Sequence, residues 1–322
     1  MTTKPRARPG PAPGPADQLA TALARLSHAG QPSEVTELPG GLTNHNYRVR
    51  TGALDVVVRV SSPTSALLAV DHEHEWLNSL SAAQAGVGAP VVDYVPGAGI
   101  LVVEFLPGRT YAAADVGANL RRIAASLRRL HAGPEFASRF DMFDIQRSYA
   151  AIVRRRDLRV PEGYWRLGAA AGRVEQALRV HPDPLVPCHN DLLAANFLDD
   201  GGDVRIIDYE YSGTNEASFE LGNLVNESLL GHDHLVEVVD AYHGRVSNRL
   251  LARAELWGLA GQYAWTLWGA IQHGVSDLDA DFWAFTTERF EPAAALLTSR
   301  RLDALLASAV GDDPGDRTGE PR

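Results

Sequence analysis

CHNDLLAANFL, at Cys188–Leu198, and IIDYE, at Ile206–Glu210, are the two stretches that decide the fold of this chain. Together they place an aspartate at Asp191, an amide at Asn196 and a second aspartate at Asp208. Phosphoryl transfer requires a protein to hold an acceptor hydroxyl in line with the phosphate and to neutralise charge with a metal ion. Two acids and an amide at this spacing suit both tasks, so the sequence predicts a kinase.

Each of the three side chains has a predicted role. Asp191 accepts the proton of the acceptor hydroxyl, and Asn196 offers its amide oxygen to Mg²⁺. Asp208 ends the apolar strand VRII and supplies a carboxylate to the metal, because Mg²⁺ prefers oxygen ligands. The alternative is a polar turn that happens to contain these residue types, but it leaves three matched positions and the hairpin between them unexplained.

The polar neighbours of this motif are further candidates. His189 and Asn190 are taken as catalytic residues, although His189 fits a buried prop for the loop better than a general base. Asn190 orients either the loop or the phosphates. Glu210 is predicted to lie near a second metal, with a solvent-facing strand end as the alternative. Cys188 could be a thiol nucleophile, but its flanking residues fit the phosphoryl-transfer motif instead.

Composition limits the possible partners. Of 322 residues, 45% are apolar and 22% are charged, which is ordinary for a globular protein with one large or two modest domains. The formal net charge of −10 argues against nucleic acid or an anionic membrane as partner and tolerates a cationic small-molecule substrate. Lys4 is the only lysine, so any cation that contacts ATP within the fold must be an arginine. Nothing in the composition predicts the oligomeric state.

Cysteine content and hydropathy bear on location. The single cysteine, Cys188, argues against a disulfide framework and fits a reducing compartment. No apolar run approaches the roughly 20 residues that a membrane-spanning helix needs. The N-terminal segment lacks the apolar core of a signal peptide. The sequence therefore predicts a cytoplasmic protein without membrane insertion.

Patterning divides the chain into four parts. Residues 1–16 and 311–322 are rich in Pro, Gly and charge and are predicted to be disordered tails. Residues 17–105 are predicted to form a nucleotide-binding lobe, in which short β-prone pieces surround one main helix at about residues 67–85. Residues 106–310 carry long amphipathic segments and are predicted to form a helical catalytic and substrate lobe. The predicted fold class is α+β and bilobal, with a small antiparallel sheet in the first lobe.

The first lobe contains a candidate phosphate-binding turn. Gly40 and Gly41 stand between two predicted strands, and glycine lets backbone N–H groups approach phosphates closely. Thr43 and Asn44 follow the turn and are included as nucleotide-binding candidates. An ordinary hairpin turn is the alternative for this segment.

A charged residue in an apolar strand is the second nucleotide signal. Arg59 interrupts VVVRV and needs a partner there, so we expect it to contact the α- and β-phosphates and to pair with Glu73, or alternatively with Glu75, on the main helix. An arginine on an edge strand that points to water is the competing interpretation. Glu104 and Leu106, in the connector between the lobes, complete the predicted nucleotide site.

These motifs carry a family resemblance. CHNDLLAANFL with IIDYEYSGTNEASFELGN resembles the choline/ethanolamine kinase family, within the wider aminoglycoside-phosphotransferase-like and protein-kinase-like fold. The similarity extends through GGLTNHNYRVR, VVRV, LRRIAASLRRLHAG, FDMFDI and WTLWGAIQ, and thus covers about residues 35–300. It implies the bilobal kinase fold, ATP and Mg²⁺ as cofactors and an alcohol as acceptor. One departure from protein kinases is the arginine at position 59, where they have lysine.

The second half of the chain suggests a cationic acceptor. Four of the six tryptophans fall between residues 257 and 283, and Trp265 and Trp268 share one helix face. Aromatic faces hold quaternary ammonium, at about 0.5–2 kcal/mol for each contact. The resemblance to choline kinases implies an acceptor pocket, and its matching positions here are Tyr211, Glu227, Trp265, Trp268 and Phe285. Tryptophans that simply pack a helical core are the alternative.

Three functions therefore compete. The first is an ATP- and Mg²⁺-dependent kinase of choline or a related amino alcohol such as ethanolamine. The second keeps the enzyme but changes the acceptor to an aminoglycoside, another antibiotic hydroxyl or thiamine, which the acidic stretch DLDAD at 277–281 leaves open. The third is a non-catalytic nucleotide-binding scaffold, but the presence of all three motif residues argues against it.

Overall fold

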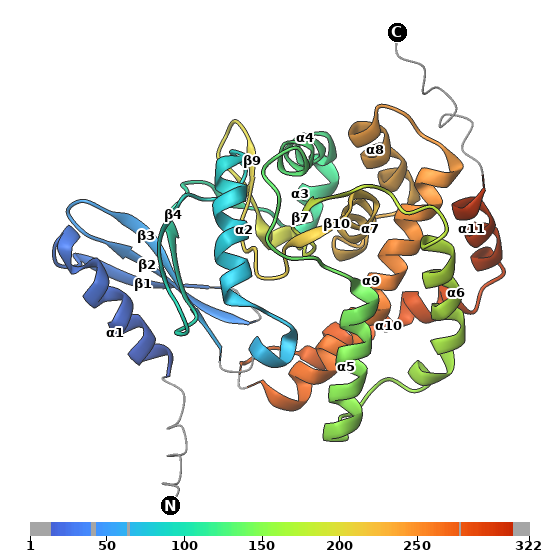
Figure 1. The fold of residues 1–322 in the computed structure, drawn as a ribbon, viewed down its shortest axis with the longest axis horizontal. Helices are drawn as coiled ribbons and strands as arrows, with labels where there is room; N and C mark the ends of the chain where they lie inside the picture. The colour runs from blue at the N-terminus through green and yellow to red at the C-terminus, as the bar shows by residue number, and fades with distance from the viewer. Residues whose placement is uncertain (1–13, 40–42, 63–64, 277, 312–322) are drawn as a thin grey trace, which may run out of the picture. The chain divides into compact units, whose positions relative to one another are not determined.

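The computed structural model describes residues 14–39, 43–62, 65–276 and 278–311. The chain divides into two compact units: Met1–Ser65 with Val92–Phe105, and Ala66–Val91 with Leu106–Arg322. The smaller unit contains an antiparallel sheet and the larger is mainly helical (Figure 1), which confirms the predicted α+β fold class. Most of both predicted tails, at 1–13 and 312–322, lies outside the described residues.

The smaller unit is built on a five-stranded sheet with the order β1-β2-β3-β5-β4. In β3, which reads DVVVRVS, the alternate residues Val56, Val58 and Val60 are at most 1% exposed. This period of two is what a strand with one face on the core requires. The strands are β1 (Glu34–Leu38), β2 (Asn44–Arg50), β3 (Asp55–Ser61), β4 (Val91–Val95) and β5 (Ile100–Glu104).

A helix that the sequence analysis missed covers this sheet. Helix α1 (Pro15–Leu26) places Ala22 and Leu26 in one apolar cluster with the valines of β3. The prediction of a disordered tail through residue 16 is therefore wrong for its last two residues. Proline is tolerated in the first turn of a helix, because its missing N–H would have no partner there, so the Pro-rich composition did not mark the helix start.

The main helix of the first half belongs, by its contacts, to the larger unit, whereas the sequence placed it in the lobe at 17–105. Helix α2 (His72–Gln84) begins after Asp71, whose side chain caps it by accepting the N–H of Glu73 at 3.0 Å. Its Asn78 donates to the carbonyl oxygen of Ser212 at 3.1 Å. The bond from Asn78 ties α2 to the segment that follows the second motif.

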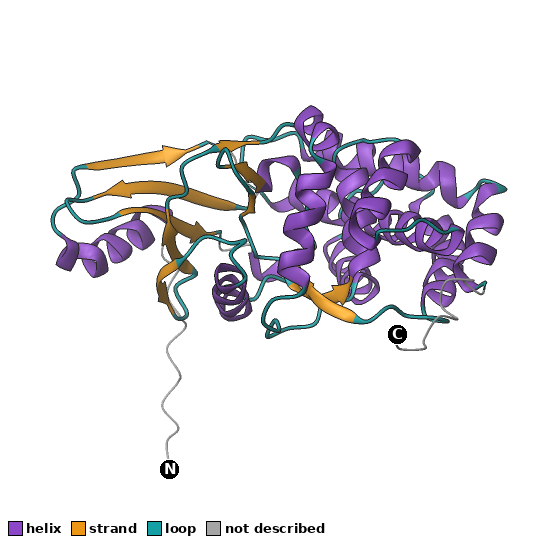
Figure 2. Cartoon of the chain, turned by 90° about the horizontal axis from the view of Figure 1, so that it is seen from above, coloured by secondary structure: helices purple, strands orange, loops and turns teal. Residues whose placement is uncertain are grey.

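Helices make up most of the larger unit (Figure 2). Helices α4, α7 and α8 meet strand β9 in a common apolar core, where Leu127, Leu221, Val238 and Ile206 are fully buried. The helices are α3 (Ala113–Ala118), α4 (Leu120–His131), α5 (Met142–Arg156), α6 (Gly168–Leu178), α7 (Ala217–Glu227), α8 (His232–His243), α9 (Asn248–Val275), α10 (Phe282–Leu297) and α11 (Arg301–Val310). The strands are β6 (Arg109–Thr110), β7 (Leu185–Cys188), β8 (Phe197–Asp199), β9 (Val204–Ile206) and β10 (Gly213–Glu216), and β8 and β9 form the hairpin predicted from the sequence. Short 3₁₀ turns cover Ser27–Ala29, Ser65–Leu68, Tyr164–Leu167 and Ala194–Asn196.

The long helix α9 crosses α7 at backbone contact (Figure 1). A Cβ atom on Gly222 of α7 would overlap the carbonyl oxygen of Ala254 and would lie 2.7 Å from the nitrogen of Gly258. A Cβ on Gly258 of α9 would lie 2.9 Å from the carbonyl oxygen of Gly222. Only glycine at both positions allows this approach. The approach fixes where each side chain of α7 lies along the helix axis relative to α9.

We predict that Gly222→Ala destabilises the protein by about 2–4 kcal/mol, because the backbone of α9 cannot yield as a flexible side chain would. The free energy of unfolding from urea titrations followed by circular dichroism measures the loss. Gly172→Ala in α6 is the matched control, since no heavy atom lies within 4 Å of the added Cβ, and it should be neutral or gain up to about 1 kcal/mol. Equal stabilities of the wild type and Gly222→Ala would contradict the requirement for glycine at the crossing of α7 and α9.

Candidate active site

The first motif forms a loop between two strands. β7 ends at Cys188 and β8 begins at Phe197, and the loop between them carries Asp191 and Asn196. Nδ2 of Asn196 donates to the carbonyl oxygen of Asp191 at 2.9 Å and to its carboxylate Oδ2 at 3.3 Å. The amide nitrogen thus holds the carboxylate, and the amide oxygen is the atom that Asn196 has left to offer a metal ion.

The second motif is hydrogen-bonded to the first. The N–H of Ile207 donates to the carbonyl oxygen of Asn196 at 2.9 Å, which places Asp208 beside the loop. Asp208 has a left-handed backbone, with φ 74°, a conformation that is uncommon for any residue other than glycine. The structure therefore brings together Asn196, which precedes β8, and Asp208, which follows β9.

Asp191 lies among other acids. Burial is the main reason that its pKa is raised well above the ordinary value, and the negative charges of Glu227, Asp208 and Glu210 act in the same direction. Arg289 opposes them by favouring the charged form. Four carboxylates and one guanidinium therefore share a single electrostatic environment around the predicted base.

His189 is a support for the loop. Its ring is fully buried, Nε2 donates to the carbonyl oxygen of Ile207 at 2.9 Å, and Nδ1 accepts the N–H of Asp191 at 3.3 Å. Burial lowers the pKa of His189, which keeps the ring neutral and suits one donating and one accepting nitrogen. Because both nitrogens are occupied, the structure supports the interpretation of His189 as a buried prop for the loop over that of a general base.

Asn190 is a second support. It adopts a left-handed backbone (φ 66°), is fully buried, and directs Nδ2 to the carbonyl oxygens of Cys188 (3.2 Å), Tyr211 (3.1 Å) and Gly213 (3.2 Å). Its Oδ1 accepts from Asn215 at 3.0 Å. The side chain thus joins the loop to the segment that follows the second motif, which favours the loop-orienting role over contact with the phosphates.

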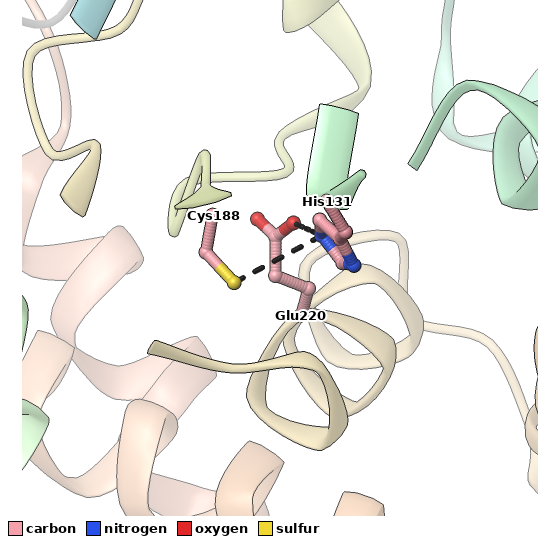
Figure 3. Close-up of side chains that lie close together, drawn as sticks. All are labelled: His131, Cys188 and Glu220. Carbon is pink, nitrogen blue, oxygen red and sulfur yellow. Dashed lines mark hydrogen bonds and ion pairs between the residues drawn. The ribbon is translucent and has the colours of Figure 1, made fainter. Parts of the chain in front are cut away.

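A buried cluster that the sequence analysis did not identify lies behind the loop (Figure 3). One carboxylate oxygen of Glu220 accepts the N–H of Asn190 at 2.7 Å, and the other lies 2.6 Å from Nε2 of His131. Nδ1 of His131 is bonded to the hydroxyl of Tyr242 at 2.7 Å, and the sulfur of Cys188 lies 3.9 Å from Nε2. Sequence spacing could not show this cluster, because its members come from four separate elements.

The geometry of this cluster identifies a hydrogen-bonded support, not a metal centre. Two ligands of one tetrahedral zinc ion stand about 3.3 Å apart, whereas the 2.6 Å between His131 and Glu220 fits a shared proton. Burial also raises the pKa of the Cys188 thiol well above its usual value, which keeps it uncharged and disfavours a role as nucleophile. The thiol-nucleophile alternative therefore has no support in the structure.

The aromatic residues predicted to bind the acceptor lie together. Nε1 of Trp268 donates to the hydroxyl of Tyr211 at 2.8 Å, and the Trp268 ring lies 4.9 Å from the ring of Phe285. The rings of Tyr211 and Trp265 are 5.1 Å apart and meet edge to face. We call Tyr211, Trp265, Trp268 and Phe285 the aromatic cluster. The two tryptophans and Tyr211 are at most 6% exposed, so these three residues are also part of the core.

The fifth acceptor candidate, Glu227, is joined to this cluster through an arginine. Glu227 pairs with Arg289, and the guanidinium carbon of Arg289 lies 3.3 Å from the centre of the Phe285 ring. The sequence analysis missed Arg289. Its spacing of four residues from Phe285 on α10 is a signal that could have found it, because residues four apart share a helix face.

A cavity of about 290 Å³ lies beside the second motif within the larger unit. Its lining includes Glu210 and Tyr211, together with the carboxylates of Asp71, Asp141 and Asp144. Glu210 itself is 7% exposed, so the solvent-facing alternative for this residue is wrong. The cavity adjoins both a predicted metal ligand and a predicted acceptor residue, and Arg139 and His74 line it beside the acids.

The nucleotide candidates of the smaller unit are distributed along its sheet. Thr43 and Asn44, at the start of β2, are buried, and Glu104 ends β5 in an exposed position. Gly40 and Gly41 lie outside the described residues. Leu106 begins the second segment of the larger unit and lines a cavity there.

Arg59 is 7% exposed and stands in β3, between β2 and β5. The interpretation of an edge-strand arginine in water is therefore wrong. On α2, Glu73 is exposed and Glu75 is 3% exposed. The pairing of Arg59 with Glu73, or alternatively with Glu75, stays a prediction.

Comparison with known proteins gives the family. The model of a family described as phosphotransferase enzyme family matches residues 34–257, which is more than half of the chain. The chain belongs to this phosphotransferase family. No helix in the part of the chain that the structure describes combines the length and the apolar character needed to cross a bilayer.

Individual relatives and solved structures show which members of the phosphotransferase family this chain is similar to. Protein LicA of Haemophilus influenzae is 26% identical over 277 residues, covering 80% of this chain and 78% of the relative. Ethanolamine kinase 2 of Rattus norvegicus is 34% identical over 128 residues, or 33% of each chain. A choline/ethanolamine kinase family protein from Mesorhizobium loti superposes with a TM-score of 0.78 at 29% identity, covering 91% of this chain and 99% of that one.

The fold is also shared by choline kinase LicA from Streptococcus pneumoniae, with a TM-score of 0.75 at 21% identity over 87% of this chain and 99% of that one. These likenesses confirm the predicted protein-kinase-like fold and the resemblance to choline/ethanolamine kinases. The phosphotransferase acts on the alcohol group of a small molecule. The interpretation as a non-catalytic scaffold is therefore wrong.

We predict that Glu220→Gln lowers kcat about tenfold, with little change in the KM for nucleotide, because the single amide oxygen of glutamine cannot accept both the Asn190 N–H and the His131 bond. Initial rates with an alcohol that the wild type phosphorylates measure the effect. Cys188→Ala is the matched control from the same cluster and should keep kcat within about twofold. A wild-type kcat in Glu220→Gln, or a bound metal that Cys188→Ala removes, would refute the support role.

Proposed function

We propose that this phosphotransferase transfers the γ-phosphoryl group of ATP to the hydroxyl of choline, or of a related amino alcohol such as ethanolamine, with Mg²⁺ as its metal. One observation carries the proposal: the aromatic cluster is hydrogen-bonded to the loop of Asp191, through the contact of Asn190 with the carbonyl oxygen of Tyr211. An acceptor held by this cluster lies next to the predicted base. The relatives named choline and ethanolamine kinase support the same acceptor class.

The donor set fits Mg²⁺. Asn196, Asp208 and Glu210 would hold the metal, and all three offer oxygen, the ligand that Mg²⁺ prefers. The crowding of acids around Asp191 is an independent reason to propose a metal ion here. Like charges held together in a buried site favour a divalent cation between them. Bound Mg²⁺ supplies charge neutralisation to the transferring phosphate.

The chain's own residues do the remaining work. Asp191 accepts the proton of the acceptor hydroxyl, and Asn196 holds its carboxylate in one orientation through Nδ2. His189 and Asn190 fix the backbone on either side of this contact. A loop that is bonded before the substrate binds loses little entropy at the reacting step.

The acceptor side suits a small cation. Aromatic faces attract ammonium groups by about 0.5–2 kcal/mol for each contact, and the rings of Tyr211, Trp265, Trp268 and Phe285 lie together. Choline and ethanolamine combine one ammonium group with one hydroxyl two carbons away.

The nucleotide side remains a set of proposals on the smaller unit and its connector. We assign the phosphates to Gly40, Gly41, Thr43, Asn44 and Arg59, and the remaining contacts to Glu104 and Leu106. The partner of Arg59 is proposed to be Glu73, with Glu75 as the alternative. A solved structure with the same fold, LicA in complex with AMP, supports a nucleotide as the phosphoryl donor. We further propose that the enzyme works in the cytoplasm, where ATP is available.

We expect the purified protein with Mg·ATP to phosphorylate choline or ethanolamine in a saturable reaction, and mass spectrometry of the product identifies the acceptor. Removal of Mg²⁺ with EDTA should abolish turnover, and added Mg²⁺ should restore it. The panel includes thiamine and kanamycin-like sugars. Turnover of these alone would replace the amino alcohol by the second candidate acceptor class.

We expect Asp191→Asn to lower kcat by about 10²–10⁴-fold, because an amide cannot accept the hydroxyl proton. Binding of nucleotide, measured by calorimetry, should change little. Asp303→Asn on the surface of α11, where Asp303 pairs with Arg173, is the control and should keep the wild-type rate. Comparable turnover by Asp191→Asn and the wild type would remove the assignment of the base.

A further inference from the structure

Arg289 places a fixed positive charge at the acceptor side of the site. It is 8% exposed, and its guanidinium contacts Glu227 through NH2 and Glu288 through NH1 at 2.9 Å. The same group lies 3.3 Å over the Phe285 ring. Two features that would attract a cationic substrate, the Glu227 carboxylate and a face of Phe285, are therefore already in contact with a cation of the protein.

The position of this arginine links it to the rest of the site. Phe285 contacts Trp268, and Trp268 is bonded to Tyr211, so Arg289 adjoins the aromatic cluster through one ring. It is also close enough to Asp191 to act on the charge of that residue. A surface arginine would be screened by water, but a buried one is screened much less.

The charges near Asp191 have separate tasks in the proposed reaction. Asp208 and Glu210 would hold the metal, and Asp191 itself is the base, so among the acids that act on Asp191 the carboxylate of Glu227 is the one left to attract an acceptor cation. Arg289 neutralises Glu227 through the buried pair, whereas its other partner, Glu288, is 51% exposed and its charge is screened by water. An ammonium group that enters the site therefore meets aromatic faces beside a neutral pair.

We propose that Arg289 determines the charge specificity of the acceptor site: by neutralising Glu227 it restricts the acceptor to molecules with a single positive charge. This inference rests on the proposed amino-alcohol kinase function. A second ammonium group on the acceptor would find no unpaired carboxylate at this wall and would be repelled by the guanidinium. The neutral pair thus separates monocationic amino alcohols from polycationic acceptors of the aminoglycoside kind.

Two probes of nearly equal size test this inference. Butyl(2-hydroxyethyl)dimethylammonium and (3-aminopropyl)(2-hydroxyethyl)dimethylammonium both keep the hydroxyethyl arm and the quaternary centre of choline. They differ in a terminal methyl group against a terminal ammonium group. Their inhibition constants against choline phosphorylation give a ratio, dication over monocation, that reports charge alone and does not require either probe to be phosphorylated.

Variants of the pair change the net charge of this wall by one unit in each direction. Arg289→Met leaves Glu227 unpaired and should lower the ratio about tenfold or more, whereas Glu227→Gln leaves the arginine unpaired and should raise it by a similar factor. The double variant Arg289→Met with Glu227→Gln, and the single variant Arg289→Lys, should give the wild-type ratio. Arg173→Met on α6, remote from this pair, is the surface control.

A purely structural role for Arg289 would slow the turnover of choline in every variant and leave the ratio unchanged, and this result would overturn the inference. Removal of a whole buried ion pair is tolerated better than removal of one partner, so the double variant and Glu227→Gln carry the test if Arg289→Met does not fold. Absence of choline and ethanolamine turnover in the wild type would overturn the proposed function and the inference with it. Turnover with an unchanged ratio would overturn the inference alone.

Discussion

The bond from the Asn190 N–H to the carboxylate of Glu220 is the interaction on which the site depends. It fixes the residue immediately before Asp191, and it does so from a helix, which is more rigid than the loop that it holds. Glu220 reaches the loop because Gly222, half a turn later on α7, lets that helix touch the backbone of α9. One close approach between two helices therefore sets the position of the base.

The same crossing also organises the acceptor side. Helix α7 continues from Glu220 to Glu227, and α9 continues from Gly258 to Trp265 and Trp268. The acid and the aromatic rings of the acceptor side thus come from the two helices that meet at the glycine contact. A shift of α7 along α9 would therefore move Glu220, which supports the loop, and Glu227, on the acceptor side, together.

The sequence predicted those parts of the protein whose signals are local. The motif spacing of Asp191, Asn196 and Asp208 identified the loop and hairpin, and the alternation of valines identified strand β3, because a period of two depends only on neighbouring residues. Helix α1 was missed, since its composition at Gly14 and Pro15 continues that of the preceding tail. For His189 and Asn190 two roles each stayed open, because polar residue types inside a motif do not reveal that their atoms are occupied by backbone groups.

Contacts between distant elements could not be predicted in the same way. Glu220 and His131 are 89 residues apart, and nothing in the local pattern of either helix distinguishes them from residues that face solvent. Arg289 stands 62 residues from Glu227, and the packing of both α7 and α10 on α9 brings the two together. Sequence patterns identify the chemical types present at a site, whereas long-range packing decides which of these groups remain available to a substrate.

The aromatic cluster shows why core packing and substrate binding need not be alternatives. Trp265 and Trp268 are as buried as core residues, yet the N–H of Trp268 is satisfied by the hydroxyl of Tyr211, and the backbone of Tyr211 is held by Asn190. The rings are therefore fixed by the same bonds that fix the base. An aromatic cluster that is rigid before the acceptor arrives adds little ordering cost to binding. The burial that makes these residues resemble core residues therefore also makes them suitable to orient a small alcohol.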